Sequence, residues 1–420
     1  MKHILALLLL LPLRLIGQSG SDTLHLNDLV REALRKNPEM KAFELNRDAM
    51  EARVGAIGTL DDPELTYMRE EMPGFRWNES MMQKIELMQM IPFPGKLSTK
   101  TEIAEIQAEH AHHDHMEKAN EVLAKLRSGY FELWYAQQSI ALNRENARLL
   151  QQFTKIAQTR YGVGQTPQQD VLKAFVEIAK LDNQLVTLRQ QELAMKSMLQ
   201  ALLNRPPTDT LGVASVPNNE LYLPTQDTLQ YLAQRYRGML LHDSLSVIES
   251  EEMLSLAKKE YLPDFKVGVQ YVRQPFADFR GWTVLAGINL PFTPWSLSRN
   301  AAMVEEANIS IEKSQEVLKN SRNMVRANIN ELYLKAQSLR KQMENYARVI
   351  VPQTQQALRA SMTAYQTGST DFLTLIDSYR MLVELSMEKL MLRMQFEQAI
   401  AQLKREVGYA GIFEMKGERN

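Results

Sequence analysis

Apolar and polar residues alternate in four short segments of the chain, which are arranged as two pairs. The segments lie at about residues 63–71 and 81–92 in the first half, and at about 264–273 and 281–291 in the second. Alternation with a period of two predicts β-strands with one apolar face. The expected apolar faces carry Leu, Ile, Val, Tyr and Trp, whereas the opposite faces carry Glu, Lys, Gln and Thr. The chain is therefore predicted to contain four amphipathic strands.

Each strand pair is followed by a long segment with helical spacing, at about 97–160 and 297–364, and then by a second helix. A helix over 97–160 would be about 96 Å long at about 1.5 Å per residue, and such helices are stabilised by packing as coiled coils. Ten positions from Val171 to Leu202 step by three and four residues, and nine of them are apolar. At the positions 204 residues later, seven of ten are apolar. The predicted fold is mainly α with a small β part, built on long antiparallel coiled-coil helices.

The order of these elements repeats along the chain. The sequence YGVGQT at Tyr161–Thr166 matches YQTGST at Tyr365–Thr370 with an offset of 204, and Pro92 matches Pro291 with an offset of 199. The chain thus leaves a strand and enters a long helix twice. The predicted division is a signal peptide at 1–17, a first repeat at 18–205, a linker at 206–226, a second repeat at 227–408 and a tail at 409–420.

Composition narrows the class of protein. The 420 residues carry a net charge of -1 and include no cysteine. The balanced charge gives no support to nucleic-acid binding, and the lack of cysteine excludes disulfides, thiolate metal sites and a lipidated cysteine. Lys2 followed by the apolar run from Ile4 to Leu13 is typical of a secretory signal peptide. No later apolar stretch is long enough for a spanning helix, so a place in a membrane would require a β-barrel.

Four strands cannot close a membrane barrel alone, because the smallest bacterial barrels use about eight. We therefore expect the chain to oligomerise. Two copies would supply eight strands and three copies would supply twelve.

Several motifs together point to a family. They are NPEM at 37–40, the junctions QMIPFPGK at 89–96 and INLPFTPW at 288–295, and the segments RYGVGQTPQQDVLKA at 160–174 and AYQTGSTDFLTLIDS at 364–378. In these motifs the chain resembles the TolC-like outer-membrane efflux proteins, especially their heavy-metal cation branch. One departure is Arg237-Gly238-Met239-Leu240, where the family tends to have Arg-Pro-Glu-Leu.

The resemblance implies a homotrimer in the outer membrane of a Gram-negative bacterium, with a twelve-stranded β-barrel in contact with outer-membrane lipid and a long α-barrel in the periplasm. It implies a passive duct rather than an enzyme, with no cofactor. Substrate, heavy-metal cations for that branch, would arrive from an inner-membrane RND-type pump through a periplasmic adaptor protein. Two alternatives stay open: the outer-membrane duct of a type I-like secretion system, and a soluble periplasmic coiled-coil scaffold.

The resemblance also assigns roles at the two helical turns. The turns are expected to meet the adaptor, and their motif residues are Tyr161, Gly164, Thr166, Tyr365, Gly368 and Thr370. Glycine permits the positive φ of such a turn, and each threonine is expected to be the N-cap of the next helix.

Two aspartates near these turns, Asp170 and Asp377, are candidate gate residues that would form carboxylate rings in a trimer. The family has two aspartates three residues apart at the second turn, whereas this chain has Thr374 and Asp377 there, and Asp170 and Lys173 at the first. The alternative is that each is an exposed acid favoured by the helix dipole.

Pro352 is a candidate hinge, because a proline inside a helix removes a backbone donor and bends the helix. The first half has Arg148 at the equivalent position. The second hairpin is therefore predicted to be the one that bends.

Four of the seven histidines lie in the segment EHAHHDH: His110, His112, His113 and His115. His112 and His115 share a helix face, as do Glu109 and His113, a spacing that could hold Zn²⁺ or Cu²⁺. We favour the alternative, in which they lie on a solvated outer face of the helix. No phosphate-binding loop, nucleophile elbow or HExxH motif is present.

Overall fold

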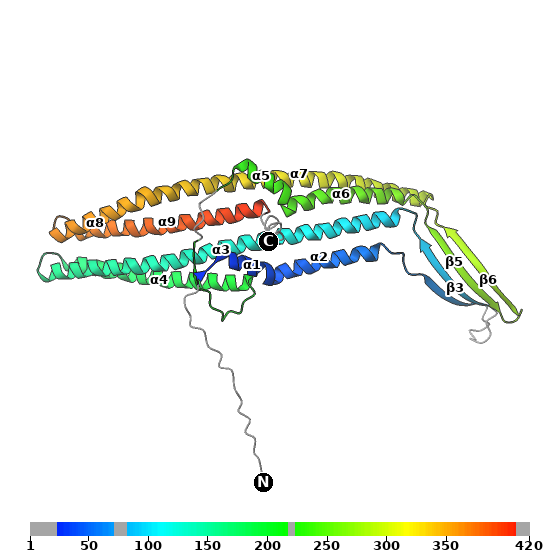
Figure 1. Ribbon diagram of the computed structural model, residues 1–420, viewed down its shortest axis with the longest axis horizontal. Helices are drawn as coiled ribbons and strands as arrows, with labels where there is room; N and C mark the ends of the chain where they lie inside the picture. The colour runs from blue at the N-terminus through cyan, green and yellow to red at the C-terminus, as the bar shows by residue number, and fades with distance from the viewer. Residues whose placement is uncertain (1–22, 71–81, 217–222, 409–420) are drawn as a thin grey trace, which may run out of the picture.

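The protein is an elongated rod with helical hairpins at one end and a β-sheet at the other (Figure 1). The computed structural model describes residues 23–70, 82–216 and 223–408. The predicted signal peptide, the tail from 409 and the tip of the first strand hairpin lie outside these residues. No helix in the described ranges is both long enough and apolar enough to cross a membrane.

The two halves follow the same order of elements, except that the single long helix of the first half is divided in the second. The first half contains β1 (Thr23–Leu24), α1 (Leu26–Lys36), α2 (Pro38–Ile57), β2 (Glu64–Glu70), β3 (Met82–Ile91), α3 (Lys96–Gly162) and α4 (Gln168–Leu202). The second half contains β4 (Val213–Ala214), α5 (Gln226–Tyr236), α6 (Gly238–Lys259), β5 (Phe265–Gln274), β6 (Phe279–Ile288), α7 (Pro294–Asn345), a π-helical segment (Tyr346–Ile350), α8 (Val351–Thr367) and α9 (Phe372–Glu406).

Both strand pairs form one antiparallel sheet in the order β2-β3-β5-β6. The register aligns apolar positions across all four strands, as in the row Leu65–Leu87–Val269–Val284. The next row is polar and consists of Thr66, Glu86, Gln270 and Thr283. The sheet therefore has one largely apolar face and one largely polar face, and the four predicted strands are confirmed.

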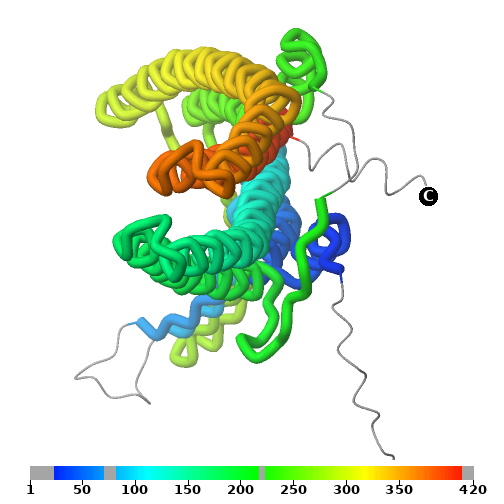
Figure 2. Tube along the Cα trace, turned by 90° about the vertical axis from the view of Figure 1, so that its left-hand side faces the viewer, coloured from blue at the N-terminus to red at the C-terminus, as the bar shows by residue number. Residues whose placement is uncertain are grey.

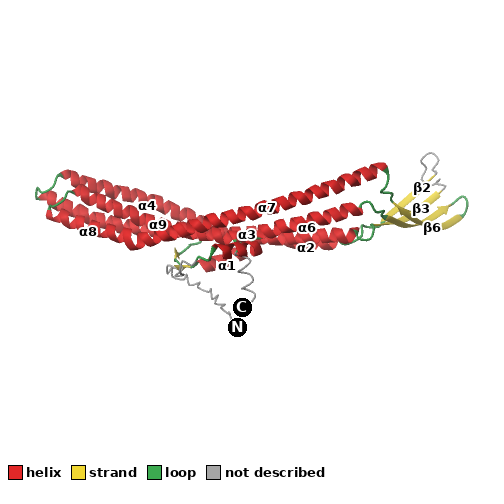
Figure 3. Cartoon of the chain, turned by 90° about the horizontal axis from the view of Figure 1, so that it is seen from above, coloured by secondary structure: helices red, strands yellow, loops and turns green. Residues whose placement is uncertain are grey.

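The helices are mainly α and very long, as the sequence predicts. The helix α3 runs for 67 residues without a break and packs against α2, α4, α6 and α9. In α4 the predicted seam faces inward, since Val171, Ala174, Leu181, Leu188 and Leu199 are buried. Figure 3 shows α4, α8 and α9 in the half of the rod that ends in the turns, and α2, α6 and α7 in the half toward the sheet.

The helical stretch before each strand pair is split in two. Asn37 ends α1 with an extended backbone, and its side chain accepts hydrogen bonds from the backbone N–H groups of Glu39 and Met40, so it caps α2. Pro38 fills the first position of α2, where its missing N–H costs nothing. In the second half Arg237 takes the place of Asn37, and no side chain caps α6.

A small sheet at the waist of the rod was not predicted. The linker contains β4, which pairs in parallel with β1. The hydroxyl of the buried Tyr130 lies 2.6 Å from the carbonyl oxygens of Leu24 and Ser215 and accepts from the N–H of Ser215 at 2.9 Å, so it links the C-terminal ends of the two strands. Two-residue strands carry too little alternation to be visible in a sequence.

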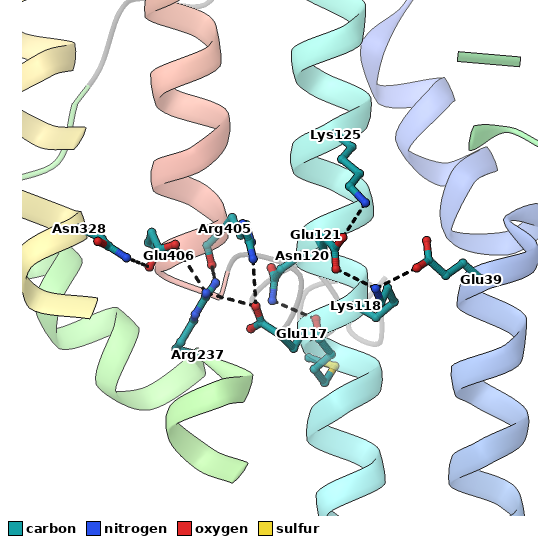
Figure 4. A network of polar contacts seen from close by, with 11 residues as sticks. Glu39, Glu117, Lys118, Asn120, Glu121, Lys125, Arg237, Asn328, Arg405 and Glu406 are labelled. Atoms are coloured by element: carbon teal, nitrogen blue, oxygen red, sulfur yellow. Dashed lines mark hydrogen bonds and ion pairs between the residues drawn. The ribbon is translucent and has the colours of Figure 1, made fainter. Parts of the chain in front are cut away.

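The two halves are joined at the waist by ion pairs around Arg237 (Figure 4). The Arg237 side chain, which is 4% exposed, lies 3.1 Å from Glu117 of α3 and 3.5 Å from Glu406 of α9. Gly238, the next residue, lets α6 approach α3, because a Cβ there would lie 2.7 Å from the carbonyl oxygen of His113. The departure Arg237-Gly238 therefore has a structural explanation.

Candidate gate at the helical tip

The two turns at the end of the rod have the same hydrogen bonds. At the first turn the N–H of Gly164 donates to the carbonyl of Tyr161 and the N–H of Gln165 to that of Arg160, each at 2.9 Å. At the second turn the equivalent bonds join Gly368 to Tyr365 at 3.1 Å and Ser369 to Ala364 at 2.8 Å. This pair of bonds is the Schellman arrangement, and its central residue needs a positive φ, here 73° at Gly164 and 80° at Gly368.

The two turn tyrosines lie in different surroundings. Tyr161 is 46% exposed, whereas Tyr365 is 1% exposed and packs against Phe372 with its ring centroid at 5.5 Å. Arg160 of the first hairpin lies over the Tyr365 ring, 4.9 Å from its centroid, and donates to the Tyr365 carbonyl. The end of α3 is thus linked to the end of α8, and Figure 2 views the molecule from this end, with the green hairpin α3–α4 beside the orange hairpin α8–α9.

The prediction that Thr166 and Thr370 are N-caps is wrong. The N-cap of α4 is Pro167, without a side-chain bond. The N-cap of α9 is Asp371, whose carboxylate accepts from the N–H of Thr374 at 2.9 Å and from its hydroxyl at 2.7 Å. Both helices begin one residue later than the threonine caps require, and at the second turn the charged carboxylate is the better acceptor for a helix N-terminus.

Asp170 lies in the first turn of α4 and is half-buried. Burial raises the pKa of Asp170 above its ordinary value, and the nearby charge of Asp371 acts in the same direction, while Lys173 and Arg160 oppose the rise. Asp371 belongs to the other hairpin. The carboxyl group of Asp170 therefore senses charges from both hairpins.

Asp377 takes part in a second link between the hairpins. Arg380 lies 3.2 Å from Asp377 on its own helix and 2.6 Å from Glu177 on α4. Burial alone would raise the pKa of Glu177, but its bonds to Arg380 and Lys180 lower it below the ordinary value. Glu177 is thus a buried carboxylate that stays charged because of its partners, and one of them comes from the second hairpin.

A groove of about 600 Å³ lies beside this link, between α4 and α9. Its lining includes Glu177, Lys180, Arg380 and Glu384. Below it, the apolar residues of the four tip helices form one buried cluster that includes Phe153, Ala174, Leu358 and Ile376. The hairpins are held together by this cluster and by the two polar links above it.

The links were not predicted from the sequence. Asp170 and Asp377 were identified, but their partners Arg160, Glu177 and Arg380 were not. Only the pair Asp377–Arg380 has a signal in the sequence, because residues three apart on a helix are neighbours. The links between hairpins depend on how each helix is rotated about its axis.

Pro352 lies two residues after the end of a π-helical segment, Tyr346–Ile350, which interrupts the second long helix. The equivalent position in the first half, Arg148, lies within the unbroken α3. Such segments mark local changes in the backbone hydrogen bonds of a helix. The asymmetry that the sequence indicated at Pro352 is thus present in the backbone.

The four histidines lie on α3 and have different partners. The Nε2 atom of His110 lies 3.1 Å from a Glu249 oxygen of α6, and its ring centroid lies 4.1 Å from that of His242. His113 lies 3.6 Å from Glu109, and the rings of His112 and His113 meet edge to face at 5.5 Å. His115 also has an interaction within the chain. Across the part of the chain that the structure describes, no group of three or more His, Cys, Asp or Glu residues is arranged to hold a metal ion.

Comparisons with known proteins agree with this architecture. A model of the outer membrane efflux protein family matches residues 29–205 and 240–409. No curated protein sequence matches the chain. A solved structure of the outer-membrane channel OprN superposes with a TM-score of 0.79 at 16% identity, over 91% of this chain and 89% of that chain.

Two further channel structures are similar. The Campylobacter jejuni CmeC outer membrane channel has a TM-score of 0.77 at 13% identity, over 92% of this chain and 86% of that chain. The open state of the Neisseria gonorrhoeae MtrE outer membrane channel has a TM-score of 0.76 at 14% identity, over 91% of this chain and 88% of that chain. At such identities the similarity establishes the fold. The two segments matched by the family model cover most of the sequence, and the chain therefore belongs to the outer membrane efflux protein family.

Proposed function

We propose that the protein is the exit duct of a tripartite efflux system, and that it carries substrate from an inner-membrane RND-type pump and a periplasmic adaptor protein across the outer membrane. The observation that carries the proposal is the polarity of the rod. One end is a sheet with an apolar face, and the other end consists of helical hairpins that close in two matching turns. An object of this shape suits a protein that is held in a membrane at one end and docks a partner at the other.

The duct requires three copies of the chain. The sheet has two unpaired edges, β2 and β6, so copies placed edge to edge would continue its hydrogen bonding. Three copies would supply a closed sheet of twelve strands, with the apolar faces toward lipid and the polar faces toward the lumen. The long helices would then form a tube in the periplasm.

We propose that the tip of this tube is the gate. Arg160–Tyr365 and Glu177–Arg380 each join the first hairpin to the second. Both links use charged groups that can exchange their partners for water when the hairpins separate. The adaptor would act at the two turns, where Tyr161, Gly164 and Thr166 lie beside Tyr365, Gly368 and Thr370. Heavy-metal cations are the substrate class that the sequence resemblance suggests.

Single-channel recording in planar lipid bilayers tests the gate. Glu177→Gln removes the charge that Arg380 binds, so we expect the open conductance to be reached several times more often than in the wild type. Lys319→Gln is the matched control, because it breaks an ion pair with Glu316 that is more than two-thirds exposed at both ends and lies away from the tip. A gate role fails if Glu177→Gln and Arg380→Gln both behave like the control. A duct role fails if no variant, nor the wild type, conducts at all.

A further inference from the structure

Three arginines lie in one row across the sheet, at the end farthest from the helices. Arg69 of β2 pairs with Gln83 of β3, Gln83 pairs with Arg273 of β5, and Arg273 pairs with Arg280 of β6. Residues paired in this way project from the same face of a sheet. The arginine row, defined as these four residues, thus crosses all four strands on one face.

That face is the apolar face of the sheet. The neighbouring row, one step toward the helices, consists of Tyr67, Ile85, Tyr271 and Trp282. The rings of Tyr271 and Trp282 lie 5.1 Å apart, and the Trp282 side chain is among the most exposed of the large apolar residues. Aromatic side chains of this kind are enriched where an apolar band meets water. The arginine row therefore begins where the apolar band ends.

The strand lengths agree with this position. The strands β3, β5 and β6 each have 10 residues, and a tilted membrane strand needs about 9–11. Phe265 and Arg273 mark the two ends of the band along β5. Charged residues are poorly tolerated on a lipid-facing surface except near its edge, so three arginines in one row suit the edge alone.

Two members of the arginine row, Arg273 and Arg280, differ from the charged residues on the polar face, which have partners. On the polar face Lys84 pairs with Glu70 at 2.7 Å, and Gln270 donates to Glu86 at 2.9 Å. Arg273 and Arg280 are exposed, lie directly opposite each other and form no ion pair with the residues that the structure describes. Like charges opposite each other in a strand pair repel. An anion between them would remove this repulsion.

We propose that the arginine row binds phosphate groups on the lipid headgroups of the membrane's outer surface. The planar guanidinium group forms paired hydrogen bonds with phosphate, and the spacing of adjacent strands brings two such groups to one anion. The aromatic row beneath would contact the upper part of the acyl chains. This inference rests on the proposed function, because it requires the apolar face of the sheet to lie in the membrane.

The test uses the full-length protein purified in detergent and fluorescent lipid A as the phosphate-bearing probe. For Arg273→Gln with Arg280→Gln we expect the dissociation constant to rise about tenfold or more, since each arginine near a lipid surface contributes attraction. Wild-type protein should lose a similar factor for lipid A from which the phosphates have been removed. Lys266→Gln is the matched control: it removes one charge from the polar face near the helices and should bind as the wild type does.

Equal binding by the wild type and the double variant would overturn the proposal, and so would an equal loss in Lys266→Gln. Binding of inorganic phosphate at the row without preference for lipid A would also contradict it. Flotation with phosphatidylcholine vesicles separates this result from the proposed function. Wild type and double variant should both float with these neutral vesicles, whereas failure of both to float would count against the membrane duct itself.

Discussion

At the scale of single residues, the contact between the two halves at the waist of the rod depends on two adjacent residues, Arg237 and Gly238. Arg237 places a positive charge, almost fully buried, between carboxylates of α3 and α9, while Gly238 removes the side chain that would hold α6 away from α3. Burial raises the pKa of Glu117, although Arg237 and Arg405 oppose that rise. Removing one member of such a group leaves the others buried without compensation, which makes these positions sensitive to substitution.

Gly238→Ala should lower the free energy of unfolding by about 1–3 kcal/mol, because the new Cβ would overlap the α3 backbone. The matched control is Gly55→Ala in α2, where nothing lies within 4 Å of a new Cβ. There the change should stabilise the protein by about 0.5–1 kcal/mol, since alanine favours a helix. Denaturant unfolding measures both. Equal effects at the two sites would refute the close approach of α6 to α3.

Acid should weaken the contact between α3 and α6 through His110. Burial lowers the pKa of His110, and the charge of His242 adds to this, while Glu249 opposes it. The unfolded chain has an ordinary histidine pKa of about 6.5, so between that value and the lowered one the unfolded state binds more protons. Stability from this group is therefore complete above about pH 6.5 and falls as the pH drops through the window below it.

Thermal melting from about pH 7 to about pH 5 tests this prediction. His110→Gln removes the titrating group, so its melting temperature should fall less over that range than the wild type's. His113→Gln should act in the same direction, because burial lowers the pKa of His113 as well. A wild-type pH dependence in both variants would show that these histidines do not couple to folding.

The contacts between the two hairpins were the part of the candidate gate that could not be predicted from the sequence. The turn glycines follow from the duplicated motif, whereas Asp170 and Asp377 follow from the resemblance to the family. The contacts Arg160–Tyr365 and Glu177–Arg380 join residues 205 and 203 positions apart. These contacts depend on how each long helix is rotated about its own axis. Apolar spacing shows which face of a helix is buried, but it does not show which individual side chains will pair.

At the scale of elements, the periodicity of apolar residues was sufficient to predict the long helices and the four strands. Each strand lies within about three residues of its predicted position, because alternation and the flanking prolines mark it clearly. The sequence did not indicate the break between α1 and α2, the break between α5 and α6, or the small sheet β1–β4. Those features depend on single backbone positions such as Arg237, where the chain becomes extended without a proline or glycine before it.

The asymmetry between the hairpins predicts which one moves. The second long helix contains a π-helical segment just before Pro352, whereas α3 is continuous. Pro352→Ala restores a backbone donor and should allow a regular helix, which would stiffen the second hairpin. We expect adaptor-dependent export and the open-state conductance to fall several times.

Pro294→Ala is the control for that experiment. Pro294 occupies the first turn of α7, where no intrahelical bond is lost, and its replacement should leave export as in the wild type. Unchanged export and conductance in Pro352→Ala would mean that the interruption at Tyr346–Ile350 is not a hinge.

At the scale of the whole molecule, a single chain leaves its most characteristic surfaces unpartnered. The edges β2 and β6 are open, and the apolar face of the sheet exposes Leu65, Val284 and Trp282 at 70%, 83% and 73%. Exposed apolar faces and open edges of this size mark surfaces that are covered in the working state. The proposed trimer covers the edges with neighbouring copies and the apolar face with lipid.

The most direct test is the native mass and membrane fraction of the detergent-extracted protein. For a trimeric duct we expect a species of three chains that is extracted from the outer membrane only with detergent. A monomer or dimer released into the periplasmic fraction without detergent would contradict it, and the soluble coiled-coil scaffold would then be the better explanation.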